Sequence, residues 1–287
     1  MRISQQEARF FYESTRLKLE TTRENLLARF IDLLAPLAKG QRGLIVGPRY
    51  AGQRLILETI ASSVAVNHPE VMIMMLLLDQ DEDEAAAVRR SVKAKVFFST
   101  CQESEVKHIH LAETALAEAS CLVENQRDVL VLVDSLTRLA QAYGAVKPCL
   151  EGTEPSTFNP IALGQTRRFF EATHLRDAGG SLTIVAIVDV EFRTPDEGIL
   201  LESFRRVAQM QIVLEQKVLA GGIFPAVNIH RSCSNSEEFI SPEDAGRIFV
   251  LRKVLEPLSP VEAAKLLGSK FLRTSSNRQF LSNMSAL

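Results

Sequence analysis

Several short segments of the sequence are apolar at every position, without the polar alternation of a strand that has one wet face. The clearest of them runs from Val129 to Val133 and is closed by Asp134. Stretches with the spacing of amphipathic helices lie between these segments. Strands that are buried on both faces and alternate with helices are typical of a parallel sheet covered by helices on both sides. The sequence therefore predicts an α/β fold.

The other segments fit the same alternation. We expect further strands of the main sheet at 43–46, 71–78, 96–99 and 181–188, and antiparallel additions near the C-terminal side at 211–214 and 227–229. Helices are expected at 1–35, 54–67, about 80–93, 104–126, 135–143 and 161–175, with two more in the last forty residues around Pro257 and Pro260. A polar loop at 144–160 is long for a compact domain, and such loops are often functional.

Composition limits the class of protein and the cellular compartment that the chain fits. The chain has 287 residues, of which 46% are hydrophobic, so it can bury a sizeable core without disulfides or metals. Its four cysteines form no CxxC pair, which fits neither a zinc site nor a disulfide framework. The N-terminus lacks the apolar stretch of a signal peptide, and no apolar run is long enough to cross a bilayer. We therefore expect a cytoplasmic protein with no membrane partner.

The segment after the strand at 43–46 has the outline of a phosphate-binding loop. Such a loop needs glycines that let backbone N–H groups wrap the phosphates, then Lys for their charge and Ser or Thr for Mg²⁺. Gly47 and Gly52 have the required spacing, but Gln53 stands in place of the Lys and Arg54 in place of the hydroxyl. Alone, this pattern also fits an ordinary strand–turn–helix. Asp134 at a strand end, where a carboxylate holds the metal, favours a nucleotide site.

An acidic stretch follows the strand at 71–78 and runs from Asp79 to Glu84. A metal cluster and the solvated first turn of a helix both fit it. The helix start is the preferred interpretation, because acidic residues are stabilised at the N-terminus of a helix.

Several motifs then occur in a familiar order. They are Gly40 to Val46, Asn67-His-Pro69, Leu76 to Asp79, Leu132 to Ala140, Arg168-Phe-Phe170, Gly179 to Ile184, Phe224-Pro-Ala226 and Ile248 to Lys253. Nearly collinearly from about Leu27 to the C-terminus, the chain resembles the RecA-like P-loop NTPase core of the transcription termination factor Rho family. The resemblance implies a family whose members are homohexameric, RNA-dependent ATPases and helicases.

The resemblance also implies a division of the chain. Residues 1–38 are expected to be an N-terminal helical segment or connector, and 39–287 the Rho-like core with a C-terminal helical part. Rho carries an N-terminal oligonucleotide-binding domain that grips RNA. We expect none here, because the first forty residues show neither the strands nor the aromatic residues of such a domain.

Positions that carry chemistry in the family are altered in this sequence. The resemblance places the catalytic Glu at Gln80, which cannot act as a base, and the Arg beside it at Asp81. It places the Arg that reaches across the subunit interface at Asn235, and a second interface Arg at Gly222. Arginine fingers alone are worth ~10³–10⁵ in rate. The catalytic positions Gln53, Arg54, Gln80 and Asn235 are therefore all expected to be degenerate.

Other family positions are kept. Asp134 would hold the metal, Arg138 follows it, Phe224 would stack on adenine, and Leu55 beside the base is still apolar. The nucleotide site implied by the resemblance comprises Gly47, Gly52, Gln53, Arg54, Leu55, Asp134 and Phe224. We expect it to bind ATP or ADP weakly, with Asp134 as a weak Mg²⁺ ligand and no cofactor required.

The two lysines that contact RNA in the family fall near Gly152 and Pro195, so RNA binding is expected to be weakened. Together these changes predict a Rho paralog that is a silent ATPase and acts by binding itself, an active Rho-like subunit or another protein. Two alternatives stay open. One is a Rho-type RNA-dependent ATPase in which Arg54 replaces the Lys, and the other is a scaffold in an assembly unrelated to transcription.

Overall fold

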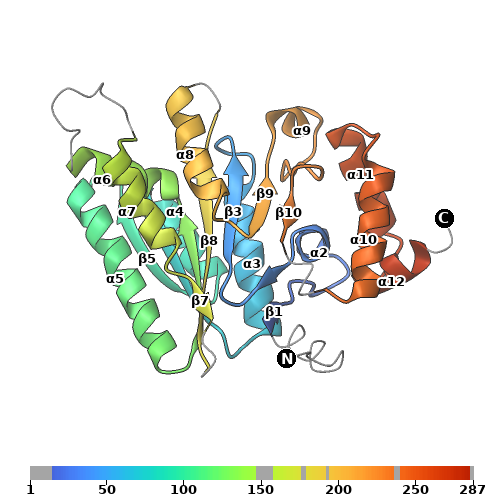
Figure 1. Cartoon of the computed structure of the whole chain (residues 1–287), viewed down its shortest axis with the longest axis horizontal. Coiled ribbons are helices and arrows are strands. Elements are labelled where there is room, and N and C mark those ends of the chain that lie inside the picture. The colour runs from blue at the N-terminus through green and yellow to red at the C-terminus, as the bar shows by residue number, and fades with distance from the viewer. Residues whose placement is uncertain (1–14, 147–157, 176–178, 192–193, 236–239, 285–287) are drawn as a thin grey trace, which may run out of the picture.

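A twisted, mostly parallel sheet forms the centre of the molecule (Figure 1). The computed structural model describes residues 15–146, 158–175, 179–191, 194–235 and 240–284. The strands follow the order β10-β9-β3-β8-β6-β4-β5, and the short β7 pairs with β8. Their bounds are β3 Arg42–Gly47, β4 Met72–Gln80, β5 Lys95–Thr100, β6 Asp128–Asp134, β7 His174–Leu175, β8 Ser181–Asp189, β9 Met210–Val213 and β10 Cys233–Ser234.

The apolar strands are buried on both faces, as predicted. Along β6, Leu130 and Leu132 belong to one hydrophobic cluster, whereas Val129, Val131 and Val133 belong to another. Successive side chains of a strand point to opposite faces, so the two clusters lie on the two sides of the sheet. Neighbouring strands from β9 to β5 all pair in parallel. The prediction of an α/β fold with a mostly parallel sheet is confirmed.

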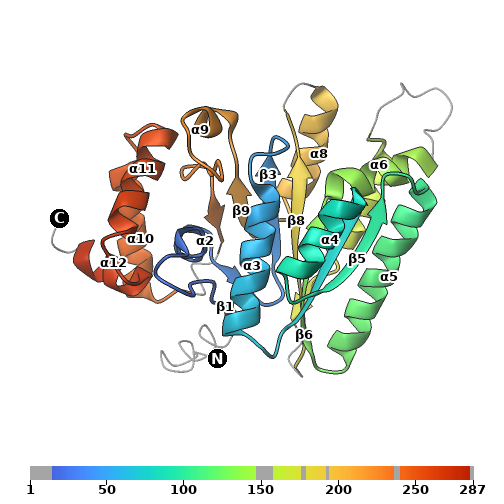
Figure 2. The ribbon, with the colours of Figure 1, turned by 180° about the vertical axis from the view of Figure 1, so that it is seen from behind.

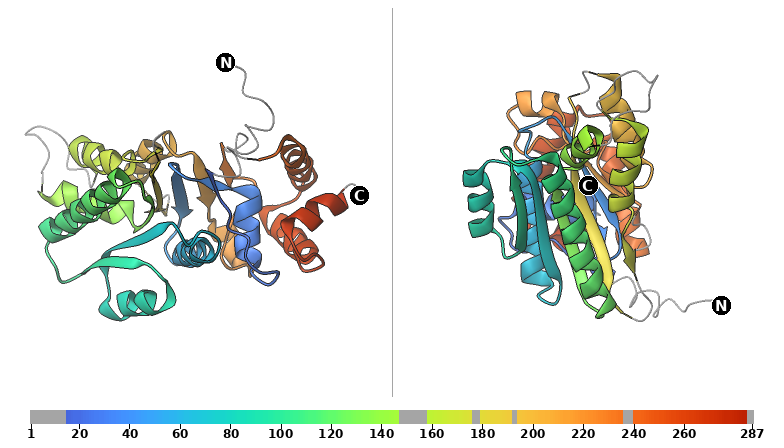
Figure 3. Two further views of the ribbon diagram at one scale, coloured as in Figure 1. Left: turned by 90° about the horizontal axis from the view of Figure 1, so that it is seen from below. Right: turned by 90° about the vertical axis from the view of Figure 1, so that its left-hand side faces the viewer.

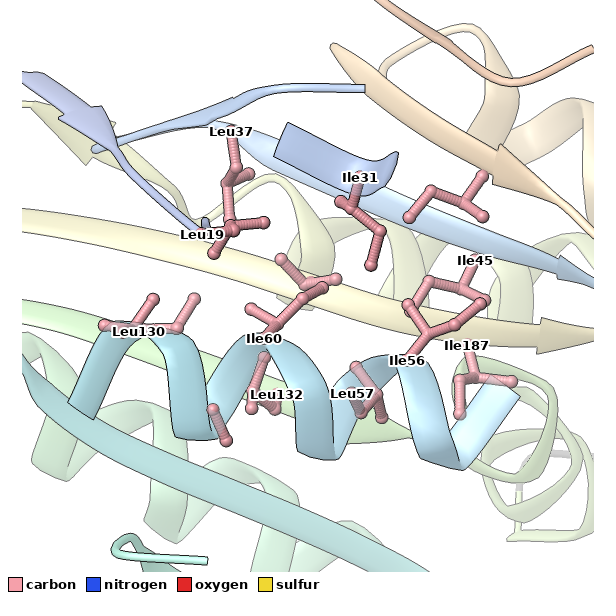
Figure 4. Close-up of a cluster of buried hydrophobic side chains, with 14 of the residues drawn as sticks. Leu19, Ile31, Leu37, Ile45, Ile56, Leu57, Ile60, Leu130, Leu132 and Ile187 are labelled. Atoms are coloured by element: carbon pink, nitrogen blue, oxygen red, sulfur yellow. The ribbon is translucent and has the colours of Figure 1, made fainter. Parts of the chain in front are cut away.

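Helices cover each face (Figures 1 and 2). On one side α3 (Gln53–Asn67) and α4 (Glu82–Ser91) contribute to the cluster that contains Leu130. In Figure 4, Ile56, Leu57 and Ile60 of α3 point toward the strands. The other face is covered by α5 (Glu105–Glu124), α6 (Leu136–Val146), α7 (Pro160–Phe170) and α8 (Pro195–Arg205). None of the helices in the described part of the chain is long and apolar enough to span a membrane.

A small helical module lies at the β10 end of the molecule (Figure 3). It consists of α10 (Pro242–Leu255), α11 (Pro260–Phe271) and α12 (Asn277–Asn283), which share a hydrophobic cluster with α2 (Leu26–Leu34). The short α9 (Gln216–Ala220) contacts α11. Proline at the first turn of α10 and α11 is favourable because that position needs no N–H donor. Three helices, not the two expected, therefore end the described chain.

The predicted helix over 1–35 is wrong for much of its described part. Residues 1–14 lie outside the described residues, and Arg16–Leu17 form strand β1, which pairs antiparallel with β2 (Leu37–Ala38). The helix α2 begins only after Asn25, whose side chain accepts a hydrogen bond from the Ala28 N–H at 3.1 Å. Pairing with β2 and burial of the neighbouring leucines override the helical spacing of the segment.

Two other expectations need correction. The strand expected to be antiparallel at 211–214 is β9, which runs parallel to β3, because α8 carries the chain back across the sheet before β9 begins. Only β10 and an isolated bridge between Leu214 and Val227 are antiparallel there. The helix predicted at 161–175 ends at Phe170, and His174–Leu175 turn back as β7 along β8.

One buried arginine joins the N-terminal segment to the C-terminal module. Arg29 of α2 is 0% exposed and donates to the carbonyl oxygens of Phe271 and Thr274, both at 2.9 Å. It also donates to the Thr274 hydroxyl at 2.8 Å and to the Asn277 side chain at 3.3 Å. Glu20 lies 3.6 Å from its Nε atom and supplies the counter-charge. A buried guanidinium is tolerable because its donors are satisfied in this way.

Replacement of Arg29 should therefore be costly. We expect Arg29→Met to lower the free energy of unfolding by about 3 kcal/mol or more, since it leaves several buried acceptors without a donor. Arg23→Met is the matched control, because exposed Arg23 also donates to the C-terminal module, at Leu272, but from the surface. Urea unfolding would measure both. Equal, small losses for the two variants would contradict this role of Arg29.

Candidate functional site

A pocket of about 590 Å³ opens where β3, β4, β6 and β8 end. The carboxyl ends of parallel strands meet at one edge of a sheet, and in open α/β folds ligands bind there. The pocket is lined by the loop after β3, by the residues that follow β4, and by the last residues of β6 and β8. Phe224 lines it from a separate segment.

The loop between β3 and α3 has the form that its glycines predict. A Cβ at Gly47 would lie 2.7 Å from the Leu214 Cβ, and one at Gly52 would lie 2.4 Å from the Pro225 Cβ. Gly52 also has φ +109°, a conformation that favours glycine. The Ala226 N–H donates to the Ala51 carbonyl at 2.9 Å, so the segment of Phe224 is fastened to the loop.

Gln53, at the position of the expected Lys, is used inside the loop. Its Nε2 donates to the carbonyl oxygens of Gly47 at 3.2 Å and Pro48 at 2.5 Å, and the residue is only 4% exposed. The amide therefore holds the loop in shape and brings no charge to the pocket.

Arg54, at the position of the expected hydroxyl, reaches across to the next strands. Its Nε and Nη2 both lie 3.1 Å from Oδ2 of Asp134, and its Nη1 lies 2.7 Å from Oε2 of Glu84. Its Nη2 also donates to the side-chain oxygen of Gln80. All three nitrogens of one guanidinium are thus used, and three oxygens from β4, α4 and β6 surround a single cation.

The electrostatics follow from this contact. Burial raises the pKa of Asp134 to about 6, and nearby Asp189 adds to the rise, while Arg54 opposes it. Burial disfavours the charged form of Arg54, but Asp134 and Glu84 outweigh it and the pKa of Arg54 is raised. Burial also raises the pKa of Asp189. Without Arg54, Asp134 would be a buried carboxylate with no cation beside it, which is strongly unfavourable.

A second ion pair lies beside the first. Arg138 of α6 pairs with Asp79, which follows a register shift near the end of β4 and has φ +55°. Five carboxyl groups line the pocket (Asp79, Asp81, Glu84, Asp134, Asp189), against three guanidinium groups (Arg49, Arg54, Arg138). The described lining contains no lysine.

A divalent metal does not fit this arrangement. Mg²⁺ requires oxygen ligands at about 2.0–2.1 Å in octahedral geometry. The Asp134 Oδ2 atom accepts a hydrogen bond from the Arg54 Nε–H at 3.1 Å and lies 3.1 Å from the Arg54 Nη2 atom, so the positive charge of Arg54 would repel the ion. Within the described ranges, no three His, Cys, Asp or Glu side chains are grouped to hold a metal. Asp134 therefore lies where predicted but is committed to an arginine.

The structure brings together most of the predicted site residues. Gln80 lies in the pocket beside Arg54, and Asp81, which also lines the pocket, occupies the N-cap position of α4 without a side-chain capping hydrogen bond. Leu55 and Phe224 line the mouth and are 41% and 60% exposed, so both are accessible to a ligand.

The remaining predicted positions lie elsewhere. Asn235 is exposed after β10, and Gly222 is exposed in a turn with φ +77°; neither lines the pocket. Pro195 is the first residue of α8. Gly152 lies outside the described residues.

Sequence reasoning missed several residues of the pocket. Asp189 ends the apolar strand β8 and Asp79 is the next-to-last residue of β4, much as Asp134 ends β6, so a common signal was present. Glu84 was interpreted as part of a solvated helix start, which holds for the first turn of α4, but its carboxylate also binds Arg54. Arg49 and Tyr50, exposed at the tip of the loop, carried no signal of their own.

The parallel sheet, the glycine loop after β3 and the carboxylate at the end of β6 define a RecA-type nucleotide-binding domain. The chain belongs to the ATP synthase alpha/beta family, nucleotide-binding domain, whose model matches residues 28–234. Solved structures agree on the fold. An ATPase from the type III secretion system of pathogenic bacteria has a TM-score of 0.74 at 18% identity, covering 90% of this chain and 82% of that chain. The ATP synthase subunit NeqB from Nanoarcheaum equitans has a TM-score of 0.69 at 22% identity, covering 79% and 61%.

Among curated proteins, the chain is similar to transcription termination factor Rho, which confirms the resemblance noted in the sequence. It is 37% identical to Rho of Pseudomonas aeruginosa over 277 residues, covering 95% of this chain and 66% of that protein. Rho of Cereibacter sphaeroides is 38% identical with the same coverage. Rho of Chromobacterium violaceum is 38% identical over 91% of this chain and 63% of that protein. The chain thus spans about two thirds of the length of these relatives.

The raised pKa of Asp134 has a consequence for stability. Because the ionised form is less favourable in the folded protein than in the unfolded chain, the contribution of Asp134 is greatest below about pH 4 and is lost as the pH rises through about 6. Relative to Asp134→Asn, the wild type should lose up to about 3 kcal/mol between these limits. Denaturant unfolding of both proteins at pH 4 and pH 7 would measure it. A difference that does not change with pH would contradict the assignment.

Proposed function

We propose that this chain is a catalytically silent member of the Rho-like group, which acts by binding and not by hydrolysing ATP. The observation that carries the proposal is the placement of Arg54, whose guanidinium lies on Asp134 and Glu84 where hydrolysis needs a metal ion. Gln53 supports the proposal, because its side-chain amide donates hydrogen bonds to carbonyl oxygens of its own loop and not to a ligand.

Phosphoryl transfer depends almost wholly on positioning and on charge around the transferred group. Removal of one such electrostatic contact typically costs about 2.7–4 kcal/mol of transition-state stabilisation. Here both the Lys and the metal ligand of the phosphate loop are replaced, and Gln80 cannot take a proton from water. The combined loss is on the order of 10⁴-fold or more in rate.

Binding is the activity that remains. The core that aligns with Rho is retained over 95% of the chain, so the surfaces through which such domains associate are built on the same frame. We propose as partner a second copy, an active Rho-like subunit or another protein. Pro195 begins α8 where the family has an RNA-contacting Lys, so RNA contributes less to any such complex.

A second candidate function is a slow, RNA-dependent ATPase. Two features of the pocket favour this function. Its volume of about 590 Å³ suits a nucleotide, and the side chains of Phe224 and Leu55 are accessible at its mouth. Arg49 or Arg54 would then have to supply the charge of the missing Lys. A scaffold in an assembly unrelated to transcription is the third candidate. A pull-down of the chain from its source organism that contains no Rho, no RNA polymerase and no RNA would favour it.

Phosphate release from ATP distinguishes the first two candidates. We expect the purified chain, with or without RNA, to hydrolyse ATP no faster than the Asp134→Asn variant, because neither protein can hold a metal at that position. The variant serves as the matched control for contaminating ATPases. Hydrolysis by the wild type that exceeds the control, and that RNA stimulates, would overturn the silent function and establish the second candidate.

A further inference from the structure

The contact between Arg54 and its three oxygens has the form of a coordination shell. Asp134 ends β6, Gln80 ends β4 and Glu84 lies in the first turn of α4, so the three oxygens come from separate elements. One side chain from the second residue of α3 meets all of them, with nitrogen–oxygen distances of 2.7 Å to Glu84 and 3.1 Å to Asp134. A cation therefore already occupies this position, and it is covalently part of the chain.

This internal cation and a divalent metal exclude each other. The side chain of Asp134 is only 10% exposed, so water cannot stabilise its charge if Arg54 moves away. If Arg54 stays, the oxygens that a metal needs are already hydrogen-bonded, and two positive centres would lie in contact. An incoming ligand therefore meets a site whose counter-charge is already in place.

The part of the pocket that Arg54 does not fill suits a ligand with an anionic group and a planar ring. The loop after β3 leads into α3, a helix of 15 residues, whose N-terminal N–H groups favour negative charge. Arg49 is exposed at the tip of the loop, and Phe224 offers an exposed ring at the mouth. Arg54 removes the repulsion that Asp134 and Glu84 would exert on a phosphate group.

The balance of charge narrows the choice of ligand. Arg54 and Arg138 are each paired with carboxylates, yet carboxyl groups still outnumber guanidinium groups among the lining residues. Without a metal to offset its charge, a triphosphate is therefore repelled more strongly than a diphosphate.

We propose that this pocket binds a nucleoside diphosphate free of divalent metal, with Arg54 serving in place of Mg²⁺. The inference rests on the proposed silent function and names the ligand of the same site. Magnesium then acts against binding, because it withdraws free nucleotide into a complex that the pocket does not accept.

Calorimetric titration of the full chain tests this directly. ADP and ATP would each be titrated in EDTA and in excess MgCl₂. We expect ADP to bind in EDTA at least as tightly as with Mg²⁺, and about tenfold or more tightly than ATP does in EDTA. MgCl₂ alone should not shift the thermal midpoint of the protein.

Two variants assign the effect to Arg54. Arg54→Thr should weaken ADP binding in EDTA by about tenfold or more, since it restores the repulsion of Asp134 and Glu84. Mg²⁺ should recover part of that loss in the variant but not improve binding to the wild type. Arg90→Thr removes an exposed arginine of α4 that does not line the pocket, and should leave both affinities unchanged.

The outcomes separate this inference from the proposed function. Wild-type binding only with Mg²⁺, or equal ADP affinity of the wild type and Arg54→Thr in EDTA, overturns metal-free binding. Failure of ADP to bind at millimolar concentration overturns it too, but leaves a silent binding protein intact. Hydrolysis above the Asp134→Asn control overturns the silent function instead. The wild-type comparison decides the question even if the Arg54→Thr chain does not fold.

Discussion

The contact of Arg54 with Asp134 and Glu84 is the constraint on which the rest of the pocket depends. It ties the start of α3 to the ends of β4 and β6 and to the first turn of α4. In a metal-dependent site these elements are held together by a ligand that comes and goes. Here one covalently attached side chain does so permanently, which makes the edge of the sheet independent of nucleotide.

Two arginines pair with three of the five carboxyl groups that line the pocket. Buried carboxylates are unfavourable unless they are paired, and loss of Asp79 would remove the ion pair of Arg138, whereas loss of Asp134 would still leave Arg54 paired with Glu84. Asp134 and Asp79 form ion pairs whether or not the site is catalytic, so their presence is weak evidence of catalysis. The same reasoning applies to glycines of the loop, which the backbone of Pro225 and Leu214 requires in any case.

The sequence predicted the parallel sheet well because its signal is local and strong. Segments such as Val129 to Val133 can only be buried on both faces, and Gly47 and Gly52 fit only a tight loop. It failed where tertiary contacts decide the outcome. Nothing in the spacing around Arg16 announced a strand, since β1 exists only because β2 lies beside it. The identity of Arg54 showed that a metal ligand was missing, but not that the guanidinium itself fills the gap, because that depends on Glu84 some thirty positions along the chain.

The buried Arg29 has a consequence for the way this chain comes to be folded. Its partners Phe271, Thr274 and Asn277 lie more than 240 positions further along the sequence. During synthesis the sheet and its covering helices emerge first, and Arg29 cannot reach its buried partners until α11 and the start of α12 have left the ribosome. Closure of such a long loop is entropically slow. We therefore expect the two ends of the chain to meet late in folding, and a product truncated before α12 to lose the hydrogen bonds between Arg29 and Asn277.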